Sequence, residues 1–411
     1  MTELTQLRAR YDELQALELS LSMTRGQPSD EQFDLSNGLL DALGVDDLVT
    51  PSGVALRNYP GGAAGLPEAR ELFAKMLGVN ASEVICGNNA SLALMSQTLT
   101  CCLLKGARAD SAPWVGSQPK MIVTVPGYDR HFKLLEGLGY EVVPVGIDSD
   151  GPDVAAIETL VANDPSIKGM YFVPVYSNPT GDSISDANVD RLVGVAAAAP
   201  DFTIFADNAY GVHHLGSERD EPKNLLRAAE VAGFADRVVL YGSTSKITFS
   251  SGGIGFMASS EANVAHFSAW LSLHTIGPNK LEQYRHVKFL EGYPGGIAGL
   301  MEQHAAIIGP KFAAVQSVLS EHLGGTGLAE WTDPNGGYFV HLVTAKPVAR
   351  RVVELAADVG VALTPAGATH PGGVDPDNRN IRLAPTRPPL AEVEQAMEIV
   401  ALCIQLASAE A

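Results

Sequence analysis

Residues 238–246 read VVLYGSTSK, an apolar run that leads into a turn of hydroxyl side chains and then a lysine. Residues 203–210 read TIFADNAY and have the same form, because an apolar run is again followed by a polar tetrapeptide. Short apolar runs bounded in this way are typical of strands that are buried on both faces. Both segments therefore predict strands of a covered sheet, each followed by a polar loop at its carboxyl end.

Similar strands are predicted upstream, and they alternate with helical stretches. Together with Thr203–Ala206 and Val238–Tyr241, they are Glu83–Cys86, Lys120–Val125, Glu141–Val145 and Gly169–Val175. Alternation of strands and helices is typical of a wound α/β sheet with mainly parallel strands.

The C-terminal third has a different pattern. A long helical region, Leu281–Leu323, is broken by GYPGG at 292–296. It is followed by a strand at Gly337–Val343, a helix near Pro347–Val359, a strand at Ile381–Leu383 and a helix at Leu390–Ala407. We expect a large domain over residues 49–290 and a smaller α+β domain made of residues 1–48 and 291–411.

Composition excludes several classes of protein. The chain has 411 residues, 46% of them apolar, which suits a globular protein with more than one core. No run approaches the roughly 18 to 20 apolar residues that span a bilayer. Residues 1–22 carry acids and have leucines at helical spacing, which indicates an amphipathic helix rather than a signal peptide. We expect a cytoplasmic protein with no membrane partner.

Charge and cysteine content limit the possible partners and sites of the protein. Lys and Arg number 28 against 47 Asp and Glu, and the net charge of -19 would repel a phosphate backbone, so nucleic-acid binding is disfavoured. The cysteines at positions 86, 101, 102 and 403 form no CxxC pair and no dense framework. They are interpreted as buried or idle thiols, and no metal site is predicted.

Four polar segments follow predicted strands, where ligands bind in open α/β sheets. They are GNNASL at 87–92, SNPTG at 177–181, DNAY at 207–210 and STSK at 243–246. Each segment alone suits an ordinary turn or a helix cap. Their order and spacing together are far more specific.

In that order the segments resemble the class I aminotransferases of fold type I, which depend on pyridoxal 5'-phosphate (PLP), and the resemblance runs from Arg25 to Arg382. It implies that Lys246 holds PLP as a Schiff base and moves the α-proton of the substrate. Asp207 would keep the pyridine nitrogen protonated, and Tyr210 and Asn178 would hydrogen-bond the phenolic oxygen of the ring. Lys246, Asp207 and Tyr210 are the predicted catalytic residues.

The same resemblance implies how the rest of the cofactor is held. Tyr128, in PGYDRHF, would stack on the ring. Tyr59, in RNYPGGAAG, would reach the phosphate from the neighbouring subunit, which implies a homodimer with shared sites. A helix N-terminus and two hydroxyls would bind the phosphate from within the chain, through Asn89, Ala90, Ser91, Ser243 and Ser245.

One position departs from the family pattern. Most class I members carry an arginine for the phosphate eight residues after the lysine, and here that residue is Ile254, within SSGGIGF. Either hydroxyls and backbone hold the phosphate, with Ser250 or Ser251 helping, or a distant arginine substitutes. This departure moves the resemblance toward the bacterial subgroup Ic aspartate aminotransferases, together with TRGQP at 24–28, RNYPGGAAG at 57–65, GNNASL at 87–92 and IGPNKLEQYRHVKFL at 276–290.

Substrate recognition is also implied by the resemblance. Arg382, in NIRLAPT, would clamp the α-carboxylate with paired hydrogen bonds, although an arginine in a strand also suits a solvated face. Gly26 would let the backbone approach the same carboxylate. A distal carboxylate would need a second cation, and Arg25, Lys280 and Arg285 remain open as candidates.

These features predict a transaminase that moves the amino group of aspartate to 2-oxoglutarate by a ping-pong mechanism. If no second cation is used, alanine or another neutral amino acid becomes the substrate. A PLP-dependent C–S β-lyase is a further alternative, since the cofactor supports that reaction on the same fold. The effector-binding half of a transcription regulator fits poorly, because the residues before the first strand contain no basic recognition helix.

Overall fold

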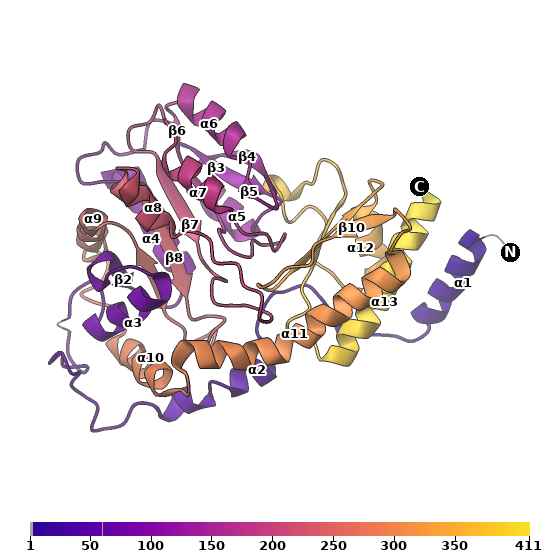
Figure 1. Cartoon of the computed structure of the whole chain (residues 1–411), viewed down its shortest axis with the longest axis horizontal. Coiled ribbons are helices and arrows are strands. Elements are labelled where there is room, and N and C mark those ends of the chain that lie inside the picture. Colours follow the sequence, from indigo (N-terminus) through magenta and orange to yellow (C-terminus); the bar gives the residue numbers. More distant parts are fainter. Residues whose placement is uncertain (1–2, 60) are drawn as a thin grey trace.

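The computed structural model describes residues 3–59 and 61–411 (Figure 1). A larger body surrounds one sheet, and a smaller body lies at the other end of the molecule. The 28-residue helix α11 (Gly296–Leu323) runs from the first body into the second. The chain is therefore built around more than one core, as its length and composition predict.

The large sheet has eight strands in the order β2-β9-β8-β7-β6-β3-β4-β5. Neighbours from β8 to β4 pair in parallel, whereas β9 and β5 are antiparallel to their neighbours. The strands are β2 (Val84–Cys86), β3 (Lys120–Val125), β4 (Glu141–Asp148), β5 (Gly151–Pro152), β6 (Ile167–Phe172), β7 (Thr203–Asp207), β8 (Val238–Ser243) and β9 (Gly255–Ala258). The predicted α/β class with a mainly parallel sheet is confirmed.

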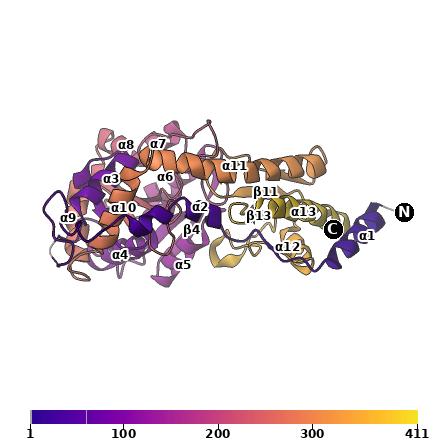
Figure 2. The same cartoon turned by 90° about the horizontal axis from the view of Figure 1, so that it is seen from below.

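Helices cover both faces of this sheet, which explains why its strands are almost wholly apolar. Along β7, Ile204 and Ala206 face one core, and Phe205 between them faces another. Figure 2 shows α6 (Val154–Asn163), α7 (Asp186–Val193) and α8 (Leu225–Val231) on one side of the sheet. The other side carries α4 (Ser91–Lys105), α5 (Asp129–Gly137) and α9 (Glu261–Leu271). Helix α3 (Pro67–Leu77) adds to the first face.

The smaller body has its own three-stranded antiparallel sheet of β10 (Ala329–Trp331), β11 (Val340–Thr344) and β13 (Asn380–Leu383). Helices α12 (Ala349–Asp358) and α13 (Leu390–Glu410) pack on it with the distal half of α11. Strand β11 begins at Val340 and not at the predicted Gly337. The Gly337 N–H is not part of the sheet, because it donates to His213 O at 2.8 Å.

The N-terminal segment joins this second core before it reaches the first. Helix α1 (Glu3–Gln15) contacts α13, and the Tyr11 hydroxyl donates to Leu355 O at 2.9 Å. Strand β1 (Leu21–Ser22) pairs in parallel with β12 (Val361–Ala362). After α2 (Asp30–Asp34), the chain packs against the large body through Leu35, Leu43 and Leu56.

The predicted break in the long helical region is confirmed, since α10 (Lys280–Gly292) ends four residues before α11 begins. The sequence did not predict β9, whose four residues follow a Ser-Gly stretch that resembles a loop. The four cysteines are buried and unpaired. Within residues 3–59 and 61–411, no helix has both the length and the apolar character needed to cross a membrane.

Docking of the N-terminal strand can be tested at Gly360, which has φ +83° and leaves no room for a Cβ, since that atom would lie 1.9 Å from Leu19 O. Gly360→Ala should lower the free energy of unfolding by more than the roughly 1–2 kcal/mol of left-handed strain alone. The matched control is Gly325→Ala, with φ +70° and open space around the new methyl group. Urea unfolding measures both variants, and equal losses would show that the β1–β12 contact contributes little.

Candidate active site

A cavity of about 140 Å³ lies at the carboxyl ends of the parallel strands. It brings together most of the residues that the four polar segments singled out. Its lining consists of Ala90, Ser91, Leu92, Tyr128, Val173, Asn178, Asp207, Ala209, Tyr210, Ser243, Ser245 and Lys246. Parallel strands place their following loops at one edge of the sheet, and this explains why segments so far apart in sequence meet here.

Lys246 sits on a tight turn directly after β8. Within that turn, the N–H groups of Ile247 and Thr248 donate to Thr244 O at 2.9 and 2.8 Å. The Lys246 carbonyl accepts from His213 Nε2 and from the Tyr338 hydroxyl, both at 3.4 Å. Its Nζ lies 4.7 Å from the centroid of the Tyr210 ring. The lysine backbone is therefore fixed from two sides while its amine faces the cavity.

Asp207 ends β7 and is held by a residue that the sequence did not reveal. His131 Nε2 lies 2.9 Å from Asp207 Oδ2, and both side chains are buried. Asp207 Oδ1 is also buried but has no hydrogen-bond partner among the described residues. The signal for His131 was present in PGYDRHF, because it lies three residues after Tyr128 at the start of α5, where i and i+3 share a face.

Two tyrosines in the cavity keep their protons. Burial and the neighbouring Asp207 charge raise the pKa of Tyr210 well above its ordinary value. Burial also raises the pKa of Tyr128 to about 12, although the Lys246 charge acts in the opposite direction. Both phenols can therefore donate hydrogen bonds at neutral pH. His213, beneath Lys246, is neutral there, because burial and nearby cationic groups lower its pKa to about 3.

The N-terminus of α4 opens onto one side of the cavity through Ala90 and Ser91. Gly255 makes this approach possible, since a Cβ there would lie 2.6 Å from the carbonyl carbon of Ala90. The Ser245 Oγ atom is buried without a partner. Asn89 does not line the cavity, because its side-chain amide donates to the carbonyls of Ser250 and Ser251, both at 3.0 Å.

These groups fit the PLP that the sequence resemblance implies. The unpartnered Asp207 Oδ1 can accept from a protonated ring nitrogen, and the unpartnered Ser245 Oγ can donate to a phosphate. Free N–H groups at the start of α4 favour the same anion. Lys246 supplies the amine that an aldehyde requires. In the described part of the chain, no cluster of His, Cys, Asp and Glu side chains is arranged to hold a metal ion.

Arg382, on β13, reaches the site from the smaller body. Its Nη1 donates to Asn178 Oδ1 at 3.2 Å, and its guanidinium lies over the Phe339 ring at 4.9 Å. Burial lowers its pKa from the usual arginine value, and no carboxylate of the described residues forms an ion pair with it. A solvated strand face is therefore the wrong interpretation. Gly26 packs on the same ring, where a Cβ would lie 2.3 Å from Phe339 Cζ.

The other candidate cations do not line the cavity within this chain. Lys280 is buried and its Nζ donates to the carbonyls of Ala55 and Asn58. Arg285 pairs with Glu282 at 3.2 Å. Arg25 is exposed next to Gly26, and it forms no hydrogen bond or ion pair among the contacts of the described residues.

Tyr59 is 73% exposed and also lies outside the cavity. It lines a separate surface hollow of about 570 Å³ together with Asn88, Ile276 and Lys280. Within one chain, Tyr59 therefore faces outward.

Comparison with known proteins agrees with this geometry. A family model described as aspartate amino-transferase matches residues 2–411. A Mycolicibacterium smegmatis protein named as an aminotransferase is 46% identical over 405 residues, which are 98% of this chain and 94% of that protein. The crystal structure of an aspartate transaminase from Corynebacterium glutamicum has a TM-score of 0.95 at 40% identity, covering 99% of this chain and 96% of that one.

A more distant structure shares the fold. It is the α-aminoadipate aminotransferase of Thermus thermophilus, solved with N-(5'-phosphopyridoxyl)-L-leucine, with a TM-score of 0.77 at 19% identity over 95% of this chain and 94% of that one. The family match over nearly the whole sequence, together with the lysine, carboxylate and arginine around one cavity, leads to one conclusion: the chain belongs to the aspartate aminotransferase family and is an aminotransferase.

Proposed function

We propose that this aminotransferase uses PLP to move the amino group of aspartate to 2-oxoglutarate. The observation that carries the proposal is that Lys246 and Asp207 line one cavity, while Arg382 arrives from the smaller body and donates to Asn178, another residue of the cavity lining. Aspartate as the donor is supported by the name of the Corynebacterium glutamicum relative, at 40% identity.

PLP, when bound, supplies an electron sink for the bond that breaks at the substrate α-carbon. In the proposed mechanism Lys246 Nζ holds the cofactor between turnovers, then takes the α-proton and returns it. Asp207, fixed by His131, would hold a proton at the ring nitrogen. Tyr210 would donate a hydrogen bond to the phenolic oxygen of the ring, since burial keeps its own hydroxyl protonated. Asn178 lines the cavity and accepts a hydrogen bond from Arg382, so it would link the cofactor site to the substrate arginine.

One lysine and one cavity would serve both half-reactions. The first keto acid must then leave before the second enters, because Arg382 can hold only one α-carboxylate at a time. A ping-pong order follows from this arrangement.

For the distal carboxylate of aspartate we favour Arg25. Lys280 donates to two backbone carbonyls, and Arg285 is paired with Glu282. Arg25 adjoins Gly26, which packs on the ring that lies beneath Arg382. In this proposal its guanidinium would turn toward a substrate held by Arg382, and in a chain of net charge -19 a local cation would help to attract a dicarboxylate.

A homodimer with shared sites belongs to the same proposal. Tyr59 and Ile276 are 73% and 65% exposed and line one hollow, and apolar side chains gathered in this way mark protein interfaces. Tyr59 would then reach the phosphate of the partner subunit. Ile254, in the place of the usual arginine, supports membership of subgroup Ic.

Two further assignments remain proposals. The first is that the larger unit comprises residues 49–290 and the smaller one residues 1–48 with 291–411. The separate cores of the two bodies support two units, while Leu43, Leu300 and Met301 pack with the core of the larger one. The second is a cytoplasmic location.

The substrate assignment predicts that aspartate bleaches the visible band of bound PLP and releases oxaloacetate, and that 2-oxoglutarate then restores the band. Lys246→Ala should lower turnover at least about a hundredfold, the contribution of a positioned acid–base group. Absorbance and product analysis measure both. A response to alanine but not to aspartate would move the assignment to a neutral amino acid, whereas pyruvate and a free thiol from a cysteine conjugate would indicate a lyase.

Removing the proposed second cation should distinguish recognition of the distal carboxylate from recognition of the α-carboxylate. Arg25→Gln should raise KM for aspartate about tenfold or more and leave alanine turnover unchanged, since a hydrogen bond to a charged group contributes roughly 1.5–3 kcal/mol. Arg382→Gln should raise KM for both aspartate and alanine. Arg350→Gln, an exposed arginine on α12, is the control. Steady-state kinetics decide, and an unchanged aspartate KM in Arg25→Gln would exclude Arg25.

The proposed interface predicts a mass in solution of twice the chain. Ile276→Asp should shift the equilibrium to the monomer, because it places a charge in an apolar contact. Val231→Asp is the control, since Val231 is 91% exposed on α8, away from the hollow of Tyr59. Sedimentation equilibrium measures the masses, and a dimer unaffected by Ile276→Asp would place the interface elsewhere.

A further inference from the structure

The residue in the place of the usual phosphate arginine contributes no charge. The Ile254 side chain is 1% exposed and belongs to the core between the sheet and α3, α7 and α8. Its backbone N–H is used instead, and it donates to Thr244 Oγ1 at 2.9 Å. Thr244 lies between Ser243 and Ser245, both of which line the cavity. The turn that presents these serines is therefore tied back to position 254 by a hydroxyl.

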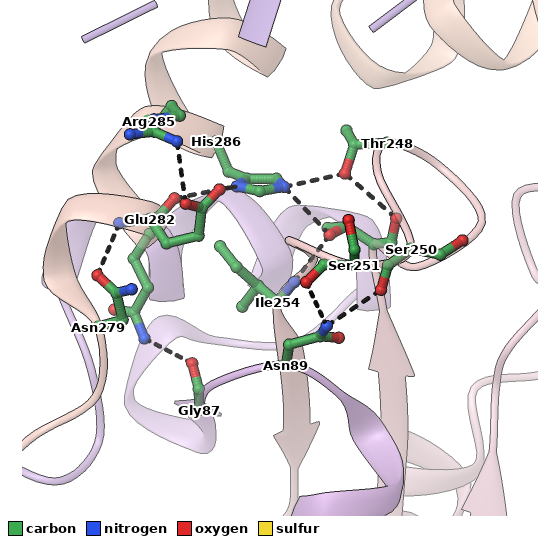
Figure 3. Close-up of polar contacts among 12 residues, drawn as sticks. Gly87, Asn89, Thr248, Ser250, Ser251, Ile254, Asn279, Glu282, Arg285 and His286 are labelled. Carbon is green, nitrogen blue, oxygen red and sulfur yellow. Dashed lines mark hydrogen bonds and ion pairs between the residues drawn. The ribbon is translucent and has the colours of Figure 1, made fainter. Parts of the chain in front are cut away.

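A buried histidine contacts the same turn from behind. His286, on α10, is fully buried, and its Nε2 lies 2.9 Å from Thr248 Oγ1 and 3.3 Å from Thr244 Oγ1. Figure 3 shows this chain of contacts, which begins at Arg285 and passes through Glu282 and His286 to Thr248. His286 thus joins both threonines of the turn that carries Lys246.

Glu282 fixes the orientation of that imidazole. His286 Nδ1 lies 2.9 Å from Glu282 O and 3.2 Å from Glu282 Oε1, so Nδ1 must carry a proton, because both atoms are acceptors. Burial alone would raise the pKa of Glu282, but the hydrogen bond from His286 and the charge of Arg285 outweigh it and lower that pKa. An ionised Glu282 keeps the ring in one tautomer and one orientation.

Helix α10 also holds the opposite wall of the site. Gln283 Nε2 donates to the carbonyls of Cys86 and Gly87 at 2.9 and 3.0 Å. The Asn279 N–H donates to Asn88 Oδ1 at 2.7 Å. These contacts anchor residues 86–88, immediately before the start of α4 that opens onto the cavity. One helix therefore positions the helix N-terminus and the serine turn together.

We infer that His286 is a positioning residue for the phosphate of PLP. It holds Thr244 and Thr248 so that Ser243, Ser245 and Lys246 face the cofactor in fixed geometry. An arginine at position 254 would attract the phosphate by charge. Here the same anion is held by preorganised neutral donors, which need a rigid support because they cannot compensate for misplacement with long-range attraction. The inference depends on PLP as the cofactor and not on aspartate as the substrate.

The test measures the rate at which PLP leaves the resting holoenzyme without substrate. Release is monitored after dilution as the loss of the absorbance band of bound PLP. His286→Phe removes both hydrogen bonds and should speed release about tenfold, the effect of losing one or two buried hydrogen bonds that support a site. His286→Gln, whose amide reaches the position of Nε2, should restore most of the retention. The phosphorus-31 resonance of the bound phosphate should broaden or shift in His286→Phe and return in His286→Gln.

His266→Phe is the matched control, because His266 donates to Gly106 O at 3.0 Å at the far end of α4 and does not touch the turn. It should lower stability but leave PLP release unchanged. Thr248→Val serves as the second variant if His286→Phe does not fold, and it should speed release in the same direction. Release at the wild-type rate in His286→Phe or Thr248→Val, or equally fast release in His266→Phe, would overturn the inference. Neither result depends on which amino acid the enzyme accepts.

Discussion

The parallel pairing of β6, β7 and β8 is the constraint on which the rest of the site depends. Their register places Phe172 opposite Ala206 and Asp207 opposite Tyr241, so the loops after the three strands begin at the same level. A slip of one residue would turn Asp207 to the opposite face of the sheet, away from the cavity. The apolar side chains on both faces oppose that slip, because it would bury the wrong set against each layer of helices.

The second body completes the site that the sheet begins. Arg382 arrives on β13, and the N-terminal segment is held beside it by hydrogen bonds from Met23 N to Ala362 O and from Thr364 Oγ1 to Thr24 O, both at 2.9 Å. Gly26 then lies against Phe339 with no room for a side chain. In the proposed assignment the arginine for the substrate belongs to one body and the cofactor residues to the other, so catalysis would require a fixed relative position of the two bodies.

Few charged side chains line the cavity. Lys246 is the one cationic side chain among the described residues that line the cavity, and Arg382 stands beside it without a carboxylate partner. Asp207 supplies the negative charge, and the other polar groups are neutral: protonated tyrosines, a neutral His213 and hydroxyls supported by His286. Such donors are worth most in a buried site, where the low local dielectric strengthens each hydrogen bond.

The sequence by itself determined the sheet, the break in the long helical region, and the meeting of Lys246, Asp207 and Asn178, because apolar periodicity and turn residues are local signals. It did not reveal β9, the His131 contact with Asp207, or the support of the serine turn by His286. It also left Lys280 and Arg285 open as substrate ligands, although backbone carbonyls and Glu282 already hold them. Each of these outcomes depends on which distant or buried group a side chain contacts, and only the packed tertiary structure decides that. Local patterns encode which face of an element is buried but not the partner that it is buried against.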